Sequence, residues 1–206
     1  MYTTLNDYEE EPHPWPPFIP PSADKLILGT FPTAVRNRGS FEFYYPNPNN
    51  DFWAVIFKVA GKELPDFAQQ DLLIIRKQIL AELRLGIADM GKRVLRQLKN
   101  SSDGNIFPLE FTNIFLLLEQ HPGIKKVIIT SSTGANSVLS WFEHYCKMNG
   151  VRLTYTSSGE LPWDFTFTLA GTKLKGTVVP SSSRASRYKG EKLIRYYRNA
   201  ILNPAR

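Results

Sequence analysis

Residues 24–32 read DKLILGTFP, a short apolar run that stops at a glycine. This pattern is typical of a buried strand that ends in a tight loop. A second run, KKVIITSS at residues 125–132, is rich in β-branched side chains and precedes a helical pattern at residues 133–150. Because strands that alternate with helices favour parallel pairing, both runs are predicted to belong to the central sheet of an α/β fold.

The remaining patterns extend this prediction along the chain. Helices are predicted at residues 52–61, 67–86 and 190–202, and within residues 91–104 up to a polar turn. Another is predicted within residues 108–123, entered through a cap at Thr112 or Asn113 and stopped by Pro122 and Gly123. Further strands are predicted at residues 151–158 and within residues 164–183. Together these elements predict a three-layer α/β/α sandwich with a mainly parallel central sheet.

The length and composition indicate one globular domain. The chain has 206 residues, which is enough for one sizeable core and cramped for two. Six prolines among residues 12–21 favour an extended backbone, so we expect a proline-rich arm at residues 1–22 and a single domain at residues 23–206. The sequence has one cysteine, no secretory pattern, and no apolar run near the roughly 20 residues of a membrane span. We expect a cytoplasmic monomer without a membrane partner.

Positive charge gathers at the carboxyl end of the chain. The formal net charge is +6, and residues 184–206 hold several basic side chains against one acid, Glu191. The basic residues are Arg184, Arg187, Lys189, Lys192, Arg195, Arg198 and Arg206. Such a segment suits a phosphate backbone, because neutralising phosphates releases their counterions. A solvated helix face explains the same charge equally well.

The loops after three predicted strands are the first candidates for a functional site. In parallel sheets the ligand crevice lies beyond the carboxyl ends of the strands, which here lead into residues 29–32, 130–136 and 180–187. The chain lacks GxSxG, GxxxxGK(S/T) and GxGxxG followed by an acid, and its histidines have no metal-ligand spacing. We therefore expect no cofactor and no metal. The serine run at residues 181–183 is interpreted as a phosphate-binding loop, with a flexible polar turn as the alternative.

Residues 39–53, GSFEFYYPNPNNDFW, combine six aromatic rings with three asparagines. Rings such as Phe43, Tyr44 and Tyr45 could stack on a nucleobase, and an asparagine amide can orient a water molecule. Hydrolysis that separates a base from its sugar needs little more, provided that the charge of the departing base is stabilised. Phe52 and Trp53 begin a predicted helix and are assigned to the core.

Five motifs together resemble a known family. LILGTFP, YYPNPNNDFW, LGIADM, HPGIKKVIIT and VVPSSSRASR occur in this order, in a likeness that covers residues 25–202. The ordered set is similar to the uracil-DNA glycosylase superfamily, and within it to the branch that removes hypoxanthine and related deaminated bases. The mismatch-specific uracil glycosylases are relatives of that branch. The resemblance implies a uracil-DNA glycosylase-like fold and a DNA partner that contains a damaged or deaminated base.

The resemblance also implies roles for single residues. Asn50, which lies just before the motif xFW, would orient the attacking water, and Tyr45 would stack on the flipped base. Further contacts to the base would come from Gly29, Thr30, Phe31 and Asn47, the last of which stands where the family has histidine. The loop that enters the minor groove would comprise Pro180, Ser181, Ser182, Ser183, Arg184 and Arg187. Its serines would hold phosphates, and Arg184 or Ala185 would fill the space that the base vacates.

These observations lead to one principal hypothesis and two rivals. The principal hypothesis is a monofunctional DNA glycosylase that hydrolyses the N-glycosidic bond of hypoxanthine, uracil or xanthine in DNA repair. It is monofunctional because no lysine lies between residues 29 and 53 to form a Schiff base. The first rival is a catalytically inactive module of the same fold that binds DNA or a base, motivated by Asn47. The second is a hydrolase of small nucleosides or nucleotides.

Overall fold

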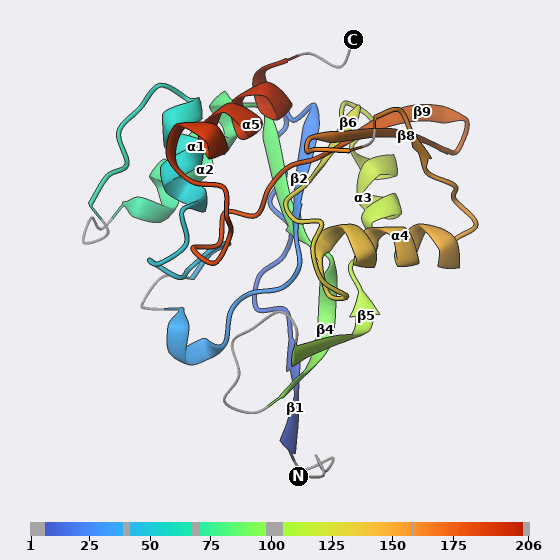
Figure 1. Cartoon of the computed structure of the whole chain (residues 1–206), viewed down its shortest axis with the longest axis horizontal. Helices are drawn as coiled ribbons and strands as arrows, with labels where there is room; N and C mark the ends of the chain where they lie inside the picture. Colours follow the sequence, from blue (N-terminus) through green and yellow to red (C-terminus); the bar gives the residue numbers. More distant parts are fainter. Residues whose placement is uncertain (1–6, 39–41, 67–70, 98–104, 158, 204–206) are drawn as a thin grey trace.

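The computed structural model describes residues 7–38, 42–66, 71–97, 105–157 and 159–203, and its centre is a six-stranded sheet (Figure 1). The strand order is β3-β2-β6-β9-β8-β7. The strands are β2 (Lys25–Gly29), β3 (Leu85–Asp89), β6 (Lys126–Ile129), β7 (Thr154–Tyr155), β8 (Trp163–Leu169) and β9 (Thr172–Val178). The pairs from β3 to β9 are parallel, and β8 and β7 add antiparallel strands at one edge. The prediction of a mainly parallel sheet is confirmed.

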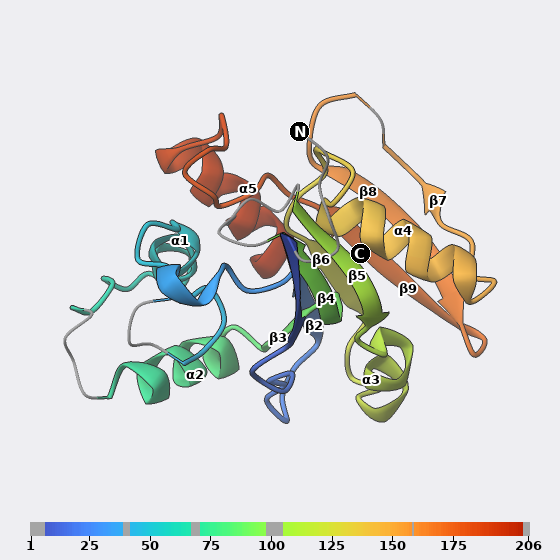
Figure 2. The ribbon, with the colours of Figure 1, turned by 90° about the horizontal axis from the view of Figure 1, so that it is seen from below.

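Helices cover both faces of this sheet (Figure 2). On one side lie α1 (Phe52–Val59), α2 (Leu72–Glu82) and α5 (Gly190–Leu202), and on the other lie α3 (Ile114–Gln120) and α4 (Val138–Met148). The central strand β2 faces both layers, because Leu26 and Leu28 pack into the core beneath α3 and α4 whereas Ile27 packs into the opposite core. The apolar run within residues 24–32 is therefore a strand buried on both faces. Among the helices in the described ranges, none is long and apolar enough to cross a membrane.

A second, three-stranded antiparallel sheet was not predicted. It consists of β1 (Tyr8–Pro12), β4 (Gly91–Gln97) and β5 (Ile106–Phe111) in the order β1-β4-β5. The predicted helix at residues 91–104 is wrong over the β4 residues, and residues 98–104 lie outside the described part. Val94 and Arg96 alternate inward with period 2, and partners on both sides hold the segment extended.

One predicted helix was placed correctly and another extends less far than expected. Within residues 108–123, where a helix with a threonine or asparagine cap was predicted, α3 begins at Ile114, and the side chain of Asn113 accepts from the backbone N–H of Leu116 as its N-cap. The helix predicted at 67–86 ends earlier than expected, because α2 ends at Glu82. The last two residues of the predicted helix, 85 and 86, belong to β3, a strand that was not predicted. All five residues of β3 are buried, and such a run cannot be told from a helix end by periodicity.

The segment at residues 7–22 is part of the packed structure. Its first half forms β1 against β4, and Phe18 exchanges backbone hydrogen bonds with Ile87 of β3. Between these two contacts, the backbone N–H of His13 donates to the carbonyl of Lys92. Pro14, Pro16 and Pro17 therefore lie between the contact with β4 and the contact with β3.

Candidate functional site

A cavity of about 970 Å³ lies at the carboxyl ends of the parallel strands. The three predicted strand exits all contribute to its wall, as does the aromatic loop that precedes α1. Its lining comprises residues 29–33, 45–47, 50, 89, 130–138, 159–161, 163, 180–183 and 185–188. The residues to which the resemblance assigns a role all line this cavity except Arg184, whereas Phe43 and Tyr44, the other candidate stacking rings, are buried and do not line it. Parallel strands bring these distant loops together because they all end at one edge of the sheet.

Tyr45 is fixed in an uncommon geometry. Its backbone φ is +52°, a left-handed conformation that few bulky residues adopt. One face of the ring stacks on Phe52, the first residue of α1, with centroids 3.7 Å apart and planes 8° apart. Its hydroxyl lies 3.2 Å from Oγ1 of Thr130, which itself donates to the carbonyl of Leu28. Tyr45 is one of the residues that line the cavity.

Asn50 joins the aromatic loop to the serine loop. Its Oδ1 accepts from the backbone N–H of Phe52 and from the hydroxyl of Ser182, both at 2.9 Å. Asn50 also forms a β-bridge with Ser183, and the next backbone N–H, of Asp51, donates to the carbonyl of Ser182. Because a backbone N–H can only donate, Oδ1 must face it, and the amide orientation is determined.

Within the serine loop, Ser182 is the buried member, at 2% exposure. Its hydroxyl interacts with Asn50 and also with Tyr197 of α5. Burial raises the pKa of Tyr197, partly offset by Ser182, so this phenol remains protonated and donates to the carbonyl of Pro180 at 3.1 Å. Ser181 accepts from the backbone N–H of Ser183 and therefore shapes the turn.

Two arginines flank the serine loop. Arg184 is exposed and contacts Oδ1 of Asn49 at 3.0 Å and the carboxylate of Asp51 at 3.4 Å. Arg187 lines the cavity, with its guanidinium 5.0 Å from the ring centroid of Tyr188. Both side chains keep most of their donors available to an anion.

The other predicted base contacts differ in accessibility. Gly29 and Thr30 border the cavity at the end of β2, and Thr30 is 7% exposed. Phe31 is equally buried and packs edge-on against the ring of His13 at 5.4 Å. Asn47 lines the cavity, but its Oδ1 accepts from the backbone N–H of Asn49 and so closes a local turn.

Asp89 and His13 are site residues that the sequence reading missed. Asp89 ends β3 and lines the cavity, and its Oδ2 lies 3.0 Å from Nε2 of His13. Both side chains are 7% exposed. An acid at the end of an apolar run would have been a signal, but residues 85 and 86 were assigned to a helix and residues 87–89 to no strand. Nothing in the sequence relates His13 to it, since the two residues are 76 positions apart.

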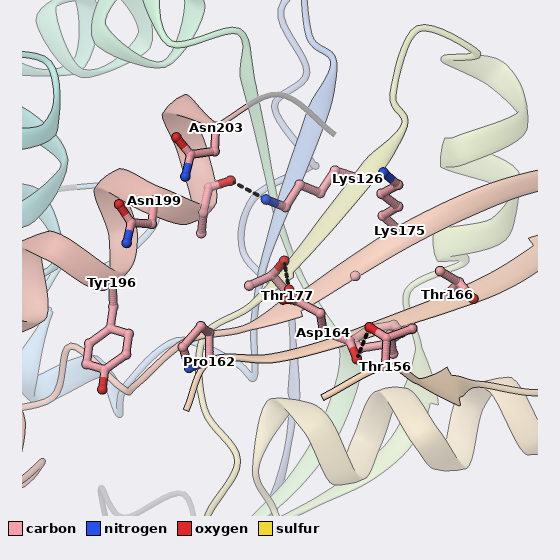
Figure 3. A pocket seen from close by; sticks show the side chains of 13 residues that line it. Lys126, Thr156, Pro162, Asp164, Thr166, Lys175, Thr177, Tyr196, Asn199 and Asn203 are labelled. Atoms are coloured by element: carbon pink, nitrogen blue, oxygen red, sulfur yellow. Dashed lines mark hydrogen bonds between the residues drawn. The ribbon is translucent and has the colours of Figure 1, made fainter. Parts of the chain in front are cut away.

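Neither a metal cluster nor the second cavity offers a better site. Within the described residues, no group of three histidine, cysteine or carboxylate side chains could hold a metal ion. The second cavity, of about 710 Å³, lies against β8, β9 and α5 (Figure 3). Two of its polar contacts are internal: Lys126 donates to the carbonyl of Ala200, and Thr177 donates to Asp164, both at 2.7 Å. Burial lowers the pKa of Lys126.

Comparisons with known proteins bear on the family and the fold of the chain. No family model matches the chain. A hypoxanthine DNA glycosylase of Methanosarcina barkeri is 29% identical over 114 residues, which are 55% of this chain and 67% of the relative. Its counterpart in Methanosarcina acetivorans is 29% identical over 113 residues, 55% of this chain and 66% of the relative. A solution NMR structure of a candidate uracil DNA glycosylase from M. acetivorans has a TM-score of 0.59 at 22% identity, covering 91% of this chain and 94% of that one.

Proposed function

Because the chain belongs to the uracil-DNA glycosylase superfamily, we propose that it is a monofunctional DNA glycosylase that removes hypoxanthine, uracil or xanthine from DNA. The observation that carries the proposal is that Tyr45, Asn50 and Ser182 line one cavity or hold its wall together. Its volume suits an extruded nucleotide, since ligand pockets typically measure about 300–1,000 Å³. The two sequence relatives are named for hypoxanthine, which supports the choice of substrate class.

In the proposed mechanism the target base leaves the duplex and stacks on Tyr45. Flipping costs a few kcal/mol, and less for a base that is mispaired. A water oriented by the Asn50 amide then attacks C1′ of the sugar, the C1′–N bond breaks, and its electron pair leaves with the base. The proton that the water loses ends on the departing base, so the products are a neutral free base and an abasic sugar.

Asn50 can take this role because its two hydrogen bonds differ. The bond from Phe52 is fixed by the backbone, whereas the Ser182 hydroxyl can rotate about its C–O bond. When the Ser182 hydroxyl turns away from Asn50, a lone pair on Asn50 Oδ1 is released to accept a hydrogen from water. A preorganised amide of this kind stabilises the transition state without a strong base.

The proposal is tested with duplexes that carry hypoxanthine, uracil or xanthine at one position. Release of at least one base, leaving an alkali-labile abasic site, is expected, and unmodified adenine and cytosine should not be released. Failure to release any of the three bases at enzyme excess would contradict the proposal. The measurement is single-turnover kinetics, which separates the chemical step from product release.

We also expect Arg184 and Arg187 to contact phosphates on either side of the lesion. Each phosphate contact contributes about −0.9 to the slope of log K against log salt. The double change Arg184→Ala with Arg187→Ala should therefore make that slope shallower by about 1–2, measured by duplex binding across a salt series. Arg152→Ala is the matched control, because Arg152 is exposed and does not line the cavity. An unchanged slope in the double variant would show that these arginines do not contact the DNA phosphates.

A binding module without catalysis is the second candidate. It is favoured by one observation: Oδ1 of Asn50 already accepts two hydrogen bonds, from Phe52 and Ser182. Such a module would bind lesion-bearing duplexes in a salt-dependent way and leave every glycosidic bond intact. The lesion panel therefore separates the two candidates.

A further inference from the structure

We propose that the second cavity binds a mononucleotide, with its phosphate held between Lys126 and Lys175 (Figure 3). This cavity lies against α5 and the strands β8 and β9. Among the described residues, it shares none of its lining with the cavity that is proposed to hold the flipped base. A nucleotide bound there would not be the substrate of the proposed glycosylase, so the two proposals stand or fall separately.

A row of three lysines crosses the central sheet at this cavity. Lys126 of β6 is in register with Lys25 of β2 and with Lys175 of β9. Residues in register on neighbouring parallel strands point to the same face of the sheet, so the three side chains leave it on one side. Like charges side by side on neighbouring strands destabilise a sheet. An anion bound at the row would offset this repulsion.

The protein neutralises only part of this positive charge. Asp24 pairs with Lys25, whereas no carboxylate of the described residues pairs with Lys126 or with Lys175. Lys126 is 8% exposed and donates to a backbone carbonyl of α5, which is an uncharged acceptor. Burial lowers the pKa of Lys126, and the neighbouring lysines lower it further against the opposing charge of Asp164. Positive charge at the row thus remains available to a ligand.

Neutral donors make up most of the remaining polar wall. The cavity measures about 710 Å³, within the range of about 300–1,000 Å³ that is usual for small-molecule sites. Asp164 is the one acid in its described lining, and an oxygen of this carboxylate already accepts from Thr177. The hydroxyl and amide groups of the lining belong to Thr156, Thr166, Thr177, Tyr196, Asn199 and Asn203. Two lysines, one acid and these neutral groups form a lining that suits phosphate oxygens.

The opposite end of the cavity suits a base. Tyr196 and Pro162 lie there, on the side away from Lys175 (Figure 3). The Tyr196 ring is half-buried and packs at right angles to the ring of Tyr188, with centroids 5.4 Å apart, and such a ring can stack on a base. The amide of Asn199, from the same helix, offers a donor and an acceptor to the base edge. The two ends of the cavity thus match the two ends of a mononucleotide.

The test is isothermal titration calorimetry of the full chain with the 5′-monophosphates of adenosine and uridine, the two nucleosides, and inorganic phosphate. At least one monophosphate should bind about 10-fold or more tightly than both its nucleoside and inorganic phosphate, as expected for a hydrogen bond to a charged group. Equal affinity for inorganic phosphate would overturn the nucleotide assignment. Absence of binding of either monophosphate at millimolar concentration would overturn the site itself.

Two lysine variants test the phosphate contacts. Lys126→Met and Lys175→Met keep the apolar part of each side chain and remove its charge, so each should weaken binding of the monophosphate by about 10-fold or more. Lys175 is only partly buried, so its replacement should barely change the melting temperature. Lys173→Met is the matched control, since Lys173 is exposed on the same strand and does not line the cavity. Unchanged affinity in either folded variant would overturn the proposed position of the phosphate.

A last measurement shows which cavity the nucleotide occupies, because Pro162 lines one cavity and the next residue, Trp163, lines the other. In two-dimensional NMR of isotope-labelled protein, the amide signal of Thr177 should shift when the monophosphate is added. Shifts confined to Asn50 and Ser182 would place the ligand in the base cavity and overturn the proposal. Nucleotide binding at Thr177 without base release from any lesion-bearing duplex would sustain the site and reject the glycosylase. Base release without nucleotide binding would do the reverse.

Discussion

Asn50→Ala is expected to lower the single-turnover rate of base release by about 10²–10³-fold, the cost of removing one preorganised polar group from a transition state. The change removes the amide that is proposed to orient water. It also removes the acceptor of Phe52 N–H and of the Ser182 hydroxyl, both at 2.9 Å. The rate is measured at enzyme excess on the lesion that wild type releases fastest, well below the melting temperature of both proteins.

Two further variants make this result specific. Asn49→Ala changes the neighbouring asparagine, which does not line the cavity and accepts from the exposed Arg184, so its rate should stay within a few-fold of wild type. Asn50→Asp keeps both accepting interactions of Asn50 and should retain more activity than Asn50→Ala. Wild-type rates in Asn50→Ala would contradict the assignment, and equal losses in Asn49→Ala would show that the loop as a whole, not the Asn50 amide, is responsible.

Trp53→Ala is expected to lower the free energy of unfolding by about 3–5 kcal/mol, as large-to-small changes of a buried aromatic residue do. Trp53 is 2% exposed, and its indole N–H donates to the carbonyl of Tyr44 at 2.9 Å. Its ring stacks on Phe43, and the guanidinium of Arg76 lies 4.5 Å from the ring centroid. The change should also loosen Tyr45, because the carbonyl that Trp53 holds belongs to the preceding residue.

The measurement is urea denaturation of Trp53→Ala, Trp53→Phe and the surface control Met148→Ala. Trp53→Phe keeps most of the apolar contact and loses the hydrogen bond, so a smaller loss of about 1–3 kcal/mol is expected. Met148 is 65% exposed, and its replacement should change the free energy of unfolding by less than about 0.5 kcal/mol. A loss below about 1 kcal/mol in Trp53→Ala would mean that this ring does not anchor the aromatic loop.

The central sheet could be predicted because its main strands are apolar on both faces. β2 and β6 are short runs of leucine, isoleucine and valine bounded by loops, and this local pattern is enough to predict a strand. β4 lacked such a signal, since residues 91–97 contain three basic side chains and become a strand only by pairing with β1 and β5. β3 was not predicted, because its buried run follows closely on the end of α2.

The candidate site likewise divides into residues that a local sequence pattern predicted and residues that it did not. Loops 29–32 and 180–187 were found because they follow recognisable strands, and Tyr45 and Asn50 because their motif resembles a family. Asp89 was not predicted because β3 was not predicted. The contact of His13 with Asp89 depends on the packing of the N-terminal segment between two sheets. Contacts between residues far apart in sequence leave no local pattern, so only the fold reveals them.

The most direct test of the central claim is the identity of the product that wild type releases from a duplex containing hypoxanthine or uracil. Chromatography and mass measurement should detect the free base, together with a full-length strand that carries one abasic site, in the presence of EDTA. Release of a nucleoside or nucleotide, a cut strand formed without alkali, or DNA that remains intact at enzyme excess would contradict the account.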